Sequence, residues 1–350
     1  MKKIGIILGI ATMGLLASCS GNNTTSNNVE KTSTNNQEKT STVVETTTGN
    51  TTSVSTTTTT KYEGKLDVSI IAPEGTPALG LANFKATYSE ANFTIANGAD
   101  PLRSAFSSAS HDIIVAPVNL GSKFFNTESN QNKYVLAKTF VWGNLFLASK
   151  TELTSFADLN GKDLVVFGQN STPDILTKIL LKENNITANI QYVGTAADAN
   201  AAIKTGNAEY AITAEPAITK AKAALGVHVL DLQDEYSKVT GKSSYPQAGI
   251  FIKASSKEDL KTLAAVDALI KSVEDTNTNP AGAAKNAVSM HKSFETLGEE
   301  VLTKAIPNCH YQILSKEAEK AAVLEFLQKM IDSGFSAQVG GKVPSAEFFL

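Results

Sequence analysis

The chain has 350 residues, which is enough for two or three domains, and its 31 Lys and Arg against 34 Asp and Glu give a formal net charge of −3. A nucleic-acid partner is not expected, because phosphate backbones bind clustered cations and Arg103 is the only arginine. Two Cys and four scattered His exclude a zinc ribbon and a disulfide framework, so we expect neither a metal nor a cofactor.

Residues 1–18 have the pattern of a secretory signal peptide. Two lysines precede an apolar run at 4–16, which is too short to cross a bilayer as a stop-transfer helix. The sequence LASC at 16–19 resembles the bacterial lipobox, in which the cysteine is diacylated and becomes the first residue of the mature protein. Cys19 is therefore the predicted lipidation site, and two acyl chains would anchor the protein on the extracytoplasmic face of the cell membrane. An ordinary signal peptide with an incidental cysteine is the alternative.

Residues 19–61 are predicted to be a disordered tether that begins at the lipidated cysteine. Of the 42 residues from 20 to 61, 29 are Ser, Thr or Asn, and the few charges cancel. Such a segment has too little apolar surface to offset the entropy of ordering it.

From residue 62 onward, apolar strand-like runs alternate with helical patterns. Strands are expected at 66–72, 93–96, 112–117, 134–137, 145–149, 163–168, 190–194, 210–213, 228–230 and 249–253. Helices are expected at 78–88 and 101–108, from 173 onward, and at 196–204, 257–274, 280–291, 295–305 and 315–333. Continuous β-branched runs between helices are typical of parallel-rich sheets that are covered on both faces. The order predicts an α/β protein of two lobes, the first made of 62–148 and 248–350 and the second of 149–247.

The sharpest local pattern is SFADLNGKDLVVFG at 155–168, followed by QNSTPDIL at 169–176. It is typical of a turn, a buried strand, a polar loop and a helix start. Ser171 or Thr172 can cap this helix, and Pro173 suits its first position. A loop between the carboxyl end of a strand and the N-terminus of a helix presents free N–H groups to a ligand. A cap that touches no ligand is the alternative.

Several segments resemble, in their order, bacterial solute-binding proteins of the NMT1/THI5-like and aliphatic-sulfonate-binding group. They are DLNGKDLVVFG with STPDILTKILL, AAIKTGNAEYAI followed by Glu-Pro at 215–216, the strand at 112–117 and the helix start at 279–281. The resemblance covers roughly 65–335 and implies a two-lobed periplasmic-binding-protein fold of type II. It also implies that the lobes close on a small solute and deliver it to the permease of an ABC importer. The protein is expected to be a monomer.

By position, the resemblance implies a cleft between the lobes. The residues that would line it are Glu74, Gly75, Thr76, Pro77, Asn119, Trp142, Asn170, Ser171, Thr172, Glu215 and Tyr245. Trp142 would stack on a planar solute, with core or hinge packing as the alternative. Glu215 would accept a hydrogen bond from an N–H or amino group, or would only cap a turn before Pro216. A simple loop is the alternative for Tyr245.

The sequence departs from the family in ways that bear on the solute. Sulfonate and nitrate binders need donors for an anion, and the single Arg103 is expected on a surface helix, although backbone N–H groups can also hold an anion. A neutral or heteroaromatic solute, such as a pyrimidine or another vitamin precursor, is therefore preferred. The chain is not expected to be an enzyme, because it has no P-loop, no G-x-S-x-G and no paired His motif. An anion binder, an enzyme of pyrimidine-precursor synthesis and a surface sensor or adhesin remain alternatives.

Overall fold

The computed structural model describes residues 38–41, 59–127 and 134–350. Within the predicted tether, β1 (Glu38–Ser41) pairs antiparallel with β2 (Thr59–Tyr62). This differs from the expectation of disorder throughout 20–61, and the high Thr content of the segment favours such pairing because β-branched residues suit strands. The predicted signal peptide, Cys19 and the rest of the tether lie outside the described residues.

The first five-stranded sheet has the order β4-β3-β5-β12-β6. Its strands are β3 (Ser69–Pro73), β4 (Asn92–Ala96), β5 (Ile113–Pro117), β6 (Tyr134–Trp142) and β12 (Pro246–Lys253). The first three are parallel, whereas β12 runs antiparallel to both β5 and β6. The helices that accompany this sheet are α1 (Thr76–Leu79), α2 (Ala82–Thr87), α3 (Asp100–Ser108) and α4 (Val118–Asn126).

The second five-stranded sheet has the order β11-β7-β10-β8-β9. Its strands are β7 (Leu145–Ser149), β8 (Asp163–Phe167), β9 (Asn189–Val193), β10 (Tyr210–Ala214) and β11 (His228–Asp231). Here β8, β9 and β10 are parallel, and β7 is antiparallel to β10 and β11. Each sheet is therefore half parallel rather than parallel-rich. Burial on both faces produces the same apolar runs in either strand direction, so the sequence pattern could not distinguish them.

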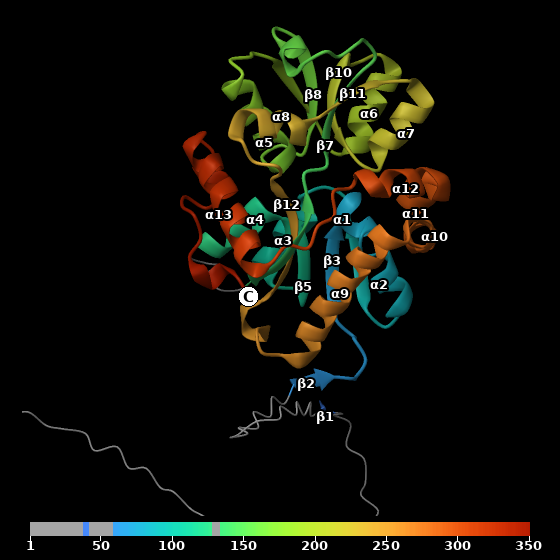
Figure 1. The fold of residues 1–350 in the computed structure, drawn as a ribbon, viewed down its shortest axis with the longest axis vertical. Coiled ribbons are helices and arrows are strands. Elements are labelled where there is room, and N and C mark those ends of the chain that lie inside the picture. Colours follow the sequence, from blue (N-terminus) through green and yellow to red (C-terminus); the bar gives the residue numbers. More distant parts are fainter. Residues whose placement is uncertain (1–37, 42–58, 128–133) are drawn as a thin grey trace, which may run out of the picture. The chain divides into compact units, whose positions relative to one another are not determined.

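Alternate residues of the second sheet belong to two separate apolar clusters. Leu145 and Leu147 of β7 pack in the main core, whereas Phe146 and Ala148 join a smaller cluster. This period of two follows from the strand pleat. The main-core face is covered by α5 (Thr172–Glu183) and α8 (Leu232–Thr240), and the other by α6 (Ala196–Thr205) and α7 (Ala217–Leu225), as Figure 1 shows. The second lobe is thus a three-layer unit.

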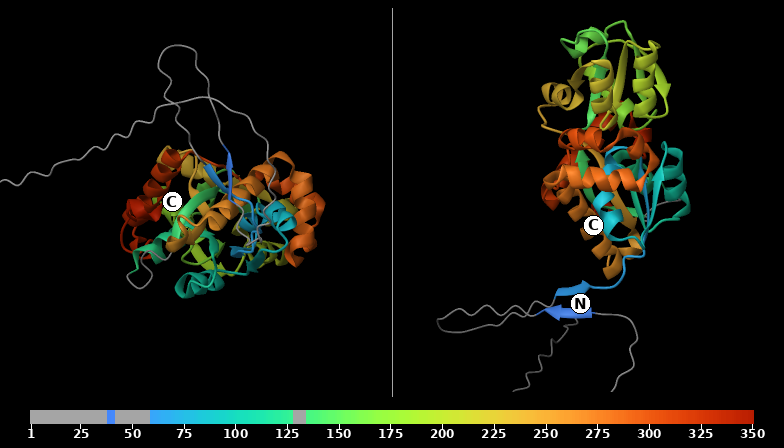
Figure 2. Two further views of the ribbon diagram at one scale, coloured as in Figure 1. Left: turned by 90° about the horizontal axis from the view of Figure 1, so that it is seen from below. Right: turned by 90° about the vertical axis from the view of Figure 1, so that its right-hand side faces the viewer.

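The C-terminal helices return to the first lobe. They are α9 (Leu260–Thr278), α10 (Pro280–Met290), α11 (Lys292–Leu297), α12 (Glu299–Ala305) and α13 (Lys316–Asp332). Helices α9 and α10 contact α2, whereas α13 contacts β12, so α10 and α13 lie on different sides of the lobe (Figures 1 and 2). Among the described residues, no helix combines the length and apolarity that a bilayer-spanning segment needs.

The chain crosses between the two sheets at two places. The first crossing follows Trp142, at Gly143 and Asn144, which have φ values of +92° and +75°. The second lies at Tyr245, between α8 and β12. The predicted boundary between residues 148 and 149 is therefore wrong by a few residues, because all of β7 belongs to the second sheet. A Gly-Asn pair is typical of a tight turn within a β-hairpin. Here the strands before and after the pair belong to different sheets.

We expect Gly121→Ala to lower the free energy of unfolding by about 1–3 kcal/mol, although alanine is the better helix former by about 1 kcal/mol. A Cβ at Gly121 in α4 would lie 2.2 Å from the ring of Phe251. That ring cannot move aside, because it packs edge-on against Phe106 and beside Phe348. Urea denaturation measures the change, with the exposed Lys123→Ala of the same helix as control. A stabilised variant would contradict the expected overpacking.

Candidate functional site

Loops that follow parallel strands of both sheets meet at one junction. Thr76 follows β3 and Asn119 follows β5 in the first lobe, whereas Thr172 follows β8 and Glu215 follows β10 in the second. Thr76 Oγ1 donates to the Glu215 carbonyl at 2.8 Å, and Thr172 Oγ1 donates to Asn119 Oδ1 at 3.2 Å. The carboxyl ends of parallel strands are where open α/β sheets bind ligands. Four of the residues predicted for the cleft thus come together across the lobes.

Thr76 is the centre of this junction and is 1% exposed. Besides its bond to Glu215, its Oγ1 accepts a hydrogen bond from Asn144 Nδ2 at 2.7 Å. Asn144 Oδ1 in turn accepts from the Glu215 N–H at 3.0 Å. These three residues form a closed ring of hydrogen bonds that joins the first lobe, the crossing and the second lobe.

The Glu215 side chain is an almost fully buried acid. Only 3% of the residue is exposed, and the peptide bond to Pro216 is cis. Its carboxyl accepts hydrogen bonds from Thr219 Oγ1 at 2.8 Å, Thr219 N at 3.2 Å and Asn308 Nδ2 at 3.4 Å. Burial raises the pKa of Glu215 to about 7, and the bonds from Thr219 and Asn308 limit the rise. A carboxyl in this state can accept a hydrogen bond or hold a proton near neutral pH.

The side chains at the start of α5 do not cap this helix. Ser171 occupies the N-cap position, but its side chain makes no capping bond, and Thr172 reaches across to the first lobe instead. Asn170 adopts φ +61°, its N–H donates to the buried Asp174 at 2.8 Å, and its side chain lies 3.4 Å from Gln338 Nε2. The predicted cap by Ser171 or Thr172 is therefore wrong, because Asp174 binds the loop backbone and Thr172 binds Asn119.

The two aromatic residues predicted for the cleft are packed at the crossings. Trp142 is 1% exposed, and its indole N–H donates to the Gln312 carbonyl at 3.1 Å. Tyr245 is fully buried between Tyr236 and Phe326, with ring centroids 5.3 Å and 5.8 Å away. These positions correspond to the core or hinge packing that the sequence left open for Trp142. Neither ring faces solvent in this structure.

The remaining predicted residues lie in the loop between β3 and α1 and in the first turn of α1. Glu74, Gly75 and Pro77 are half-buried, and the Glu74 N–H donates to the Ala96 carbonyl at 2.9 Å. Gly75 has φ +94°, a backbone conformation that side chains disfavour, and a Cβ there would lie 3.8 Å from the Glu215 carbonyl. The positive φ favours glycine at this position, whereas the space beside the Glu215 carbonyl would admit a Cβ at ordinary contact distance.

The junction carries an acid without an ion-pair partner. Arg103 binds Asp100 of its own helix at 2.6 Å and is half-exposed there, as expected for a surface residue. No ion pair of the described residues involves Glu215. The positive charge of Lys222 lowers the pKa of Glu215, but by less than the hydrogen bonds from Thr219 and Asn308 do. In the described part of the chain, no cluster of three His, Cys, Asp or Glu side chains is arranged to hold a metal ion. Within the described residues, the Glu215 carboxyl is therefore a buried hydrogen-bond acceptor with no cation at ion-pair distance.

Sequence reasoning missed three residues of the junction. Asn144 carries a weak signal, since it follows a glycine between two expected strands. Cys309 and Tyr311 carried none: Cys309 Sγ lies 3.6 Å from Thr76 Oγ1, and the Tyr311 hydroxyl donates to the Thr76 carbonyl at 2.6 Å. Burial raises the pKa of the Cys309 thiol to about 12, so this thiol is neutral near pH 7.

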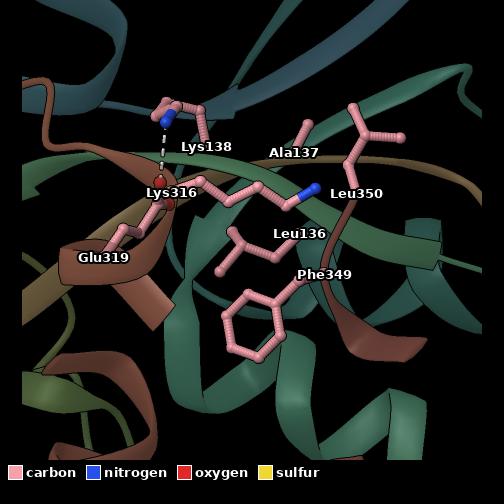
Figure 3. A pocket seen from close by; sticks show the side chains of 7 residues that line it. All are labelled: Leu136, Ala137, Lys138, Lys316, Glu319, Phe349 and Leu350. Carbon is pink, nitrogen blue, oxygen red and sulfur yellow. Dashed lines mark ion pairs between the residues drawn. The ribbon is translucent and has the colours of Figure 1, made fainter. Parts of the chain in front are cut away.

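Two surface cavities lie away from the junction. One of about 80 Å³ lies where the chain end meets β6, and Figure 3 shows the Lys138–Glu319 ion pair beside it. The other, of about 380 Å³, is an open groove between α8 and α13. At the junction itself, the polar groups of the two lobes bind each other directly.

No protein-family model matches the sequence, and no curated protein matches it. Solved structures do match. An ABC transporter protein from Parabacteroides distasonis is 22% identical with a TM-score of 0.68, over 82% of this chain and 99% of that one.

Two further similar structures are of proteins that are named after their ligands. The periplasmic aliphatic sulphonate binding protein SsuA from Escherichia coli is 16% identical with a TM-score of 0.59, over 79% of this chain and 89% of its own. The periplasmic nitrate-binding protein NrtA from Synechocystis PCC 6803 is 15% identical with a TM-score of 0.55, over 77% of this chain and 82% of its own. At these identities the shared property is the fold. The chain therefore has the two-lobed α/β fold of type II periplasmic binding proteins.

Proposed function

We propose that the protein is the solute-binding component of an ABC importer. It would capture a small organic solute between its lobes and deliver it to a membrane permease, while the lipidated Cys19 holds it as a monomer on the extracytoplasmic face of the membrane. The observation that supports this best is the junction, where polar loops of two α/β lobes face each other at Thr76 and Glu215. The fold shared with binding proteins of import systems adds support. We propose binding rather than catalysis, since the junction thiol is neutral.

The mechanism is a shift of population between open and closed lobes. The direct bonds between Thr76, Asn144 and Glu215 already join the lobes. A solute that enters must exchange some of these contacts for its own, and it favours the closed form only if it binds both lobes. The two crossings, at Gly143 and Tyr245, are the places where the backbone would bend.

The charge of the junction indicates the class of solute. Glu215 is a buried acceptor without an ion-pair partner, so an N–H or amino group is a better match than a sulfonate or nitrate. We propose a neutral, amino-bearing heterocycle, of which a pyrimidine or another vitamin precursor is an example. The second candidate is an anion. Its support is that two proteins of similar fold are named as sulphonate- and nitrate-binding proteins.

A thermal unfolding screen tests both candidates. The probes are 4-aminopyrimidine, methanesulfonate, nitrate, riboflavin and a set of amino acids. A ligand at 100 times its Kd adds about 2.7 kcal/mol to the free energy of unfolding, which raises Tm by on the order of 5 °C. We expect 4-aminopyrimidine to raise Tm and both anions to leave it unchanged. A rise with methanesulfonate alone would favour the second candidate, and no rise with any probe would contradict solute binding.

A further inference from the structure

A third segment of the chain lies at the junction besides the two crossings. Residues 309–312, which we call the strap, follow the turn η4 (Ile306–Asn308). The Trp142 N–H donates to the His310 carbonyl at 3.0 Å, and the Gln312 N–H donates to the Phe140 carbonyl at 3.1 Å. Val141 and Tyr311 also form an isolated antiparallel bridge. The strap is thus held like a short strand along the end of β6.

Side chains of the strap contact the two lobes alternately. Cys309 and Tyr311 both reach Thr76 of the first lobe, at 3.6 Å and 2.6 Å. Between them, His310 Nδ1 lies 2.6 Å from Gln233 Oε1 in α8 of the second lobe. His310 has φ +53° and Cys309 has a right-handed helical conformation, so a turn of the backbone separates the direction of the His310 side chain from those of its neighbours. One short segment therefore touches both lobes where they meet.

Tyr311 has little freedom to move. It is 6% exposed, and its ring packs so closely on Gly80 that a Cβ there would lie 2.9 Å from Cε1. Phe140 stacks on its other side, with ring centroids 6.4 Å apart. The ring thus fixes the hydroxyl, and the hydroxyl fixes the carbonyl of Thr76, whose side chain then reaches the second lobe at the Glu215 carbonyl.

We propose that Tyr311 is a positioning residue of the solute site, which holds Thr76 where it meets the second lobe. This rests on the proposed function, and Tyr311 itself need not touch the solute. Without the hydroxyl, the Thr76 carbonyl keeps only the Gly80 N–H as a donor, at 3.1 Å, and the loop from Gly75 can shift by a few tenths of an ångström. A contact at 2.8 Å between Thr76 and Glu215 weakens steeply under such a shift, so lobe closure weakens with it.

The test compares Tyr311→Phe with Tyr134→Phe in the full chain. Tyr134 is an equally buried tyrosine, and its hydroxyl also donates to a backbone carbonyl, that of His111, away from the junction. Both variants should lose similar stability in thermal unfolding, because each removes one hydrogen bond from a tyrosine hydroxyl to a backbone carbonyl. Calorimetric titration with 4-aminopyrimidine and small-angle X-ray scattering of the unliganded protein then separate positioning from mere packing.

We expect Tyr311→Phe alone to weaken the Kd for 4-aminopyrimidine by roughly tenfold and to increase the radius of gyration. Equal Kd values and equal radii for both variants would overturn the proposal. If the wild type does not bind 4-aminopyrimidine, the proposed solute is wrong, and the radii still decide the role of Tyr311. Should Tyr311→Phe not fold, Cys309→Ala removes the other contact of the strap with Thr76 and is expected to act in the same direction.

Discussion

Glu319→Ala is expected to lower the free energy of unfolding by about 3–5 kcal/mol, because it leaves Lys138, whose side chain is only 15% exposed, without its carboxylate partner. Glu319 in α13 is 5% exposed and lies 2.8 Å from Lys138 Nζ in β6 (Figure 3). Its other carboxylate oxygen accepts a hydrogen bond from the Thr139 N–H. The pair joins the C-terminal helix to the first sheet, so urea denaturation should show a loss of whole-lobe stability.

The control for this prediction is Glu317→Ala on the same helix, where the side chain is exposed and the expected change is within about 0.5 kcal/mol. Replacing both partners, as in Lys138→Met with Glu319→Met, should recover most of the loss, since buried pairs are replaceable by apolar side chains of similar size. A loss below about 1 kcal/mol for Glu319→Ala would mean that solvent and the Leu314 carbonyl, 3.2 Å from Lys138 Nζ, replace the lost carboxylate.

Glu215→Gln is expected to flatten the dependence of stability on pH between about 4.5 and 7. Burial raises the pKa of Glu215 in the folded protein to about 7, above its ordinary value of 4.5. The folded state therefore keeps its proton over a range in which the unfolded state releases it. The contribution of Glu215 to the free energy of unfolding is therefore fully present below pH 4.5. It falls by about 3 kcal/mol in all as the pH rises to 7.

Thermal or urea unfolding at a series of pH values measures this slope in the wild type and in Glu215→Gln. The glutamine has no proton to release, so the variant should lose that part of the decline and be the more stable protein at pH 8. The exposed Glu209→Gln of the same lobe is the matched control and should keep the slope of the wild type. If Glu215→Gln keeps the full decline as well, the carboxyl at the junction is not desolvated.

Local elements were predictable where a hydrophobic pattern and a boundary signal coincide. The strand expected at 163–168 is β8, and the helix expected from Pro173 begins at Thr172. Helices α4, α7 and α8 were missed, and the helix expected at 78–88 is two helices with Gly80 between them. The hydrophobic patterns of α4, α7 and α8 are too short to predict a helix. These segments are helical because they cover the face of a sheet.

The candidate site was also predictable in part. The family resemblance named Thr76, Asn119, Thr172 and Glu215 by position, and the rule that loops after parallel strands meet at one edge explains why these residues lie together. The burial of Trp142 and Tyr245 could not, because aromatic residues suit a cleft and a core equally.

The amino-acid sequence by itself determined the α/β class, the two lobes and the polar loops between them, because these depend on local periodicity and on the order of strands. Only the tertiary structure decided strand direction, the crossing at Gly143 and the contact of Tyr311 with Thr76. The last pair is 235 residues apart along the chain. Contacts of that separation arise from how complete lobes pack, and no local pattern of side chains carries them.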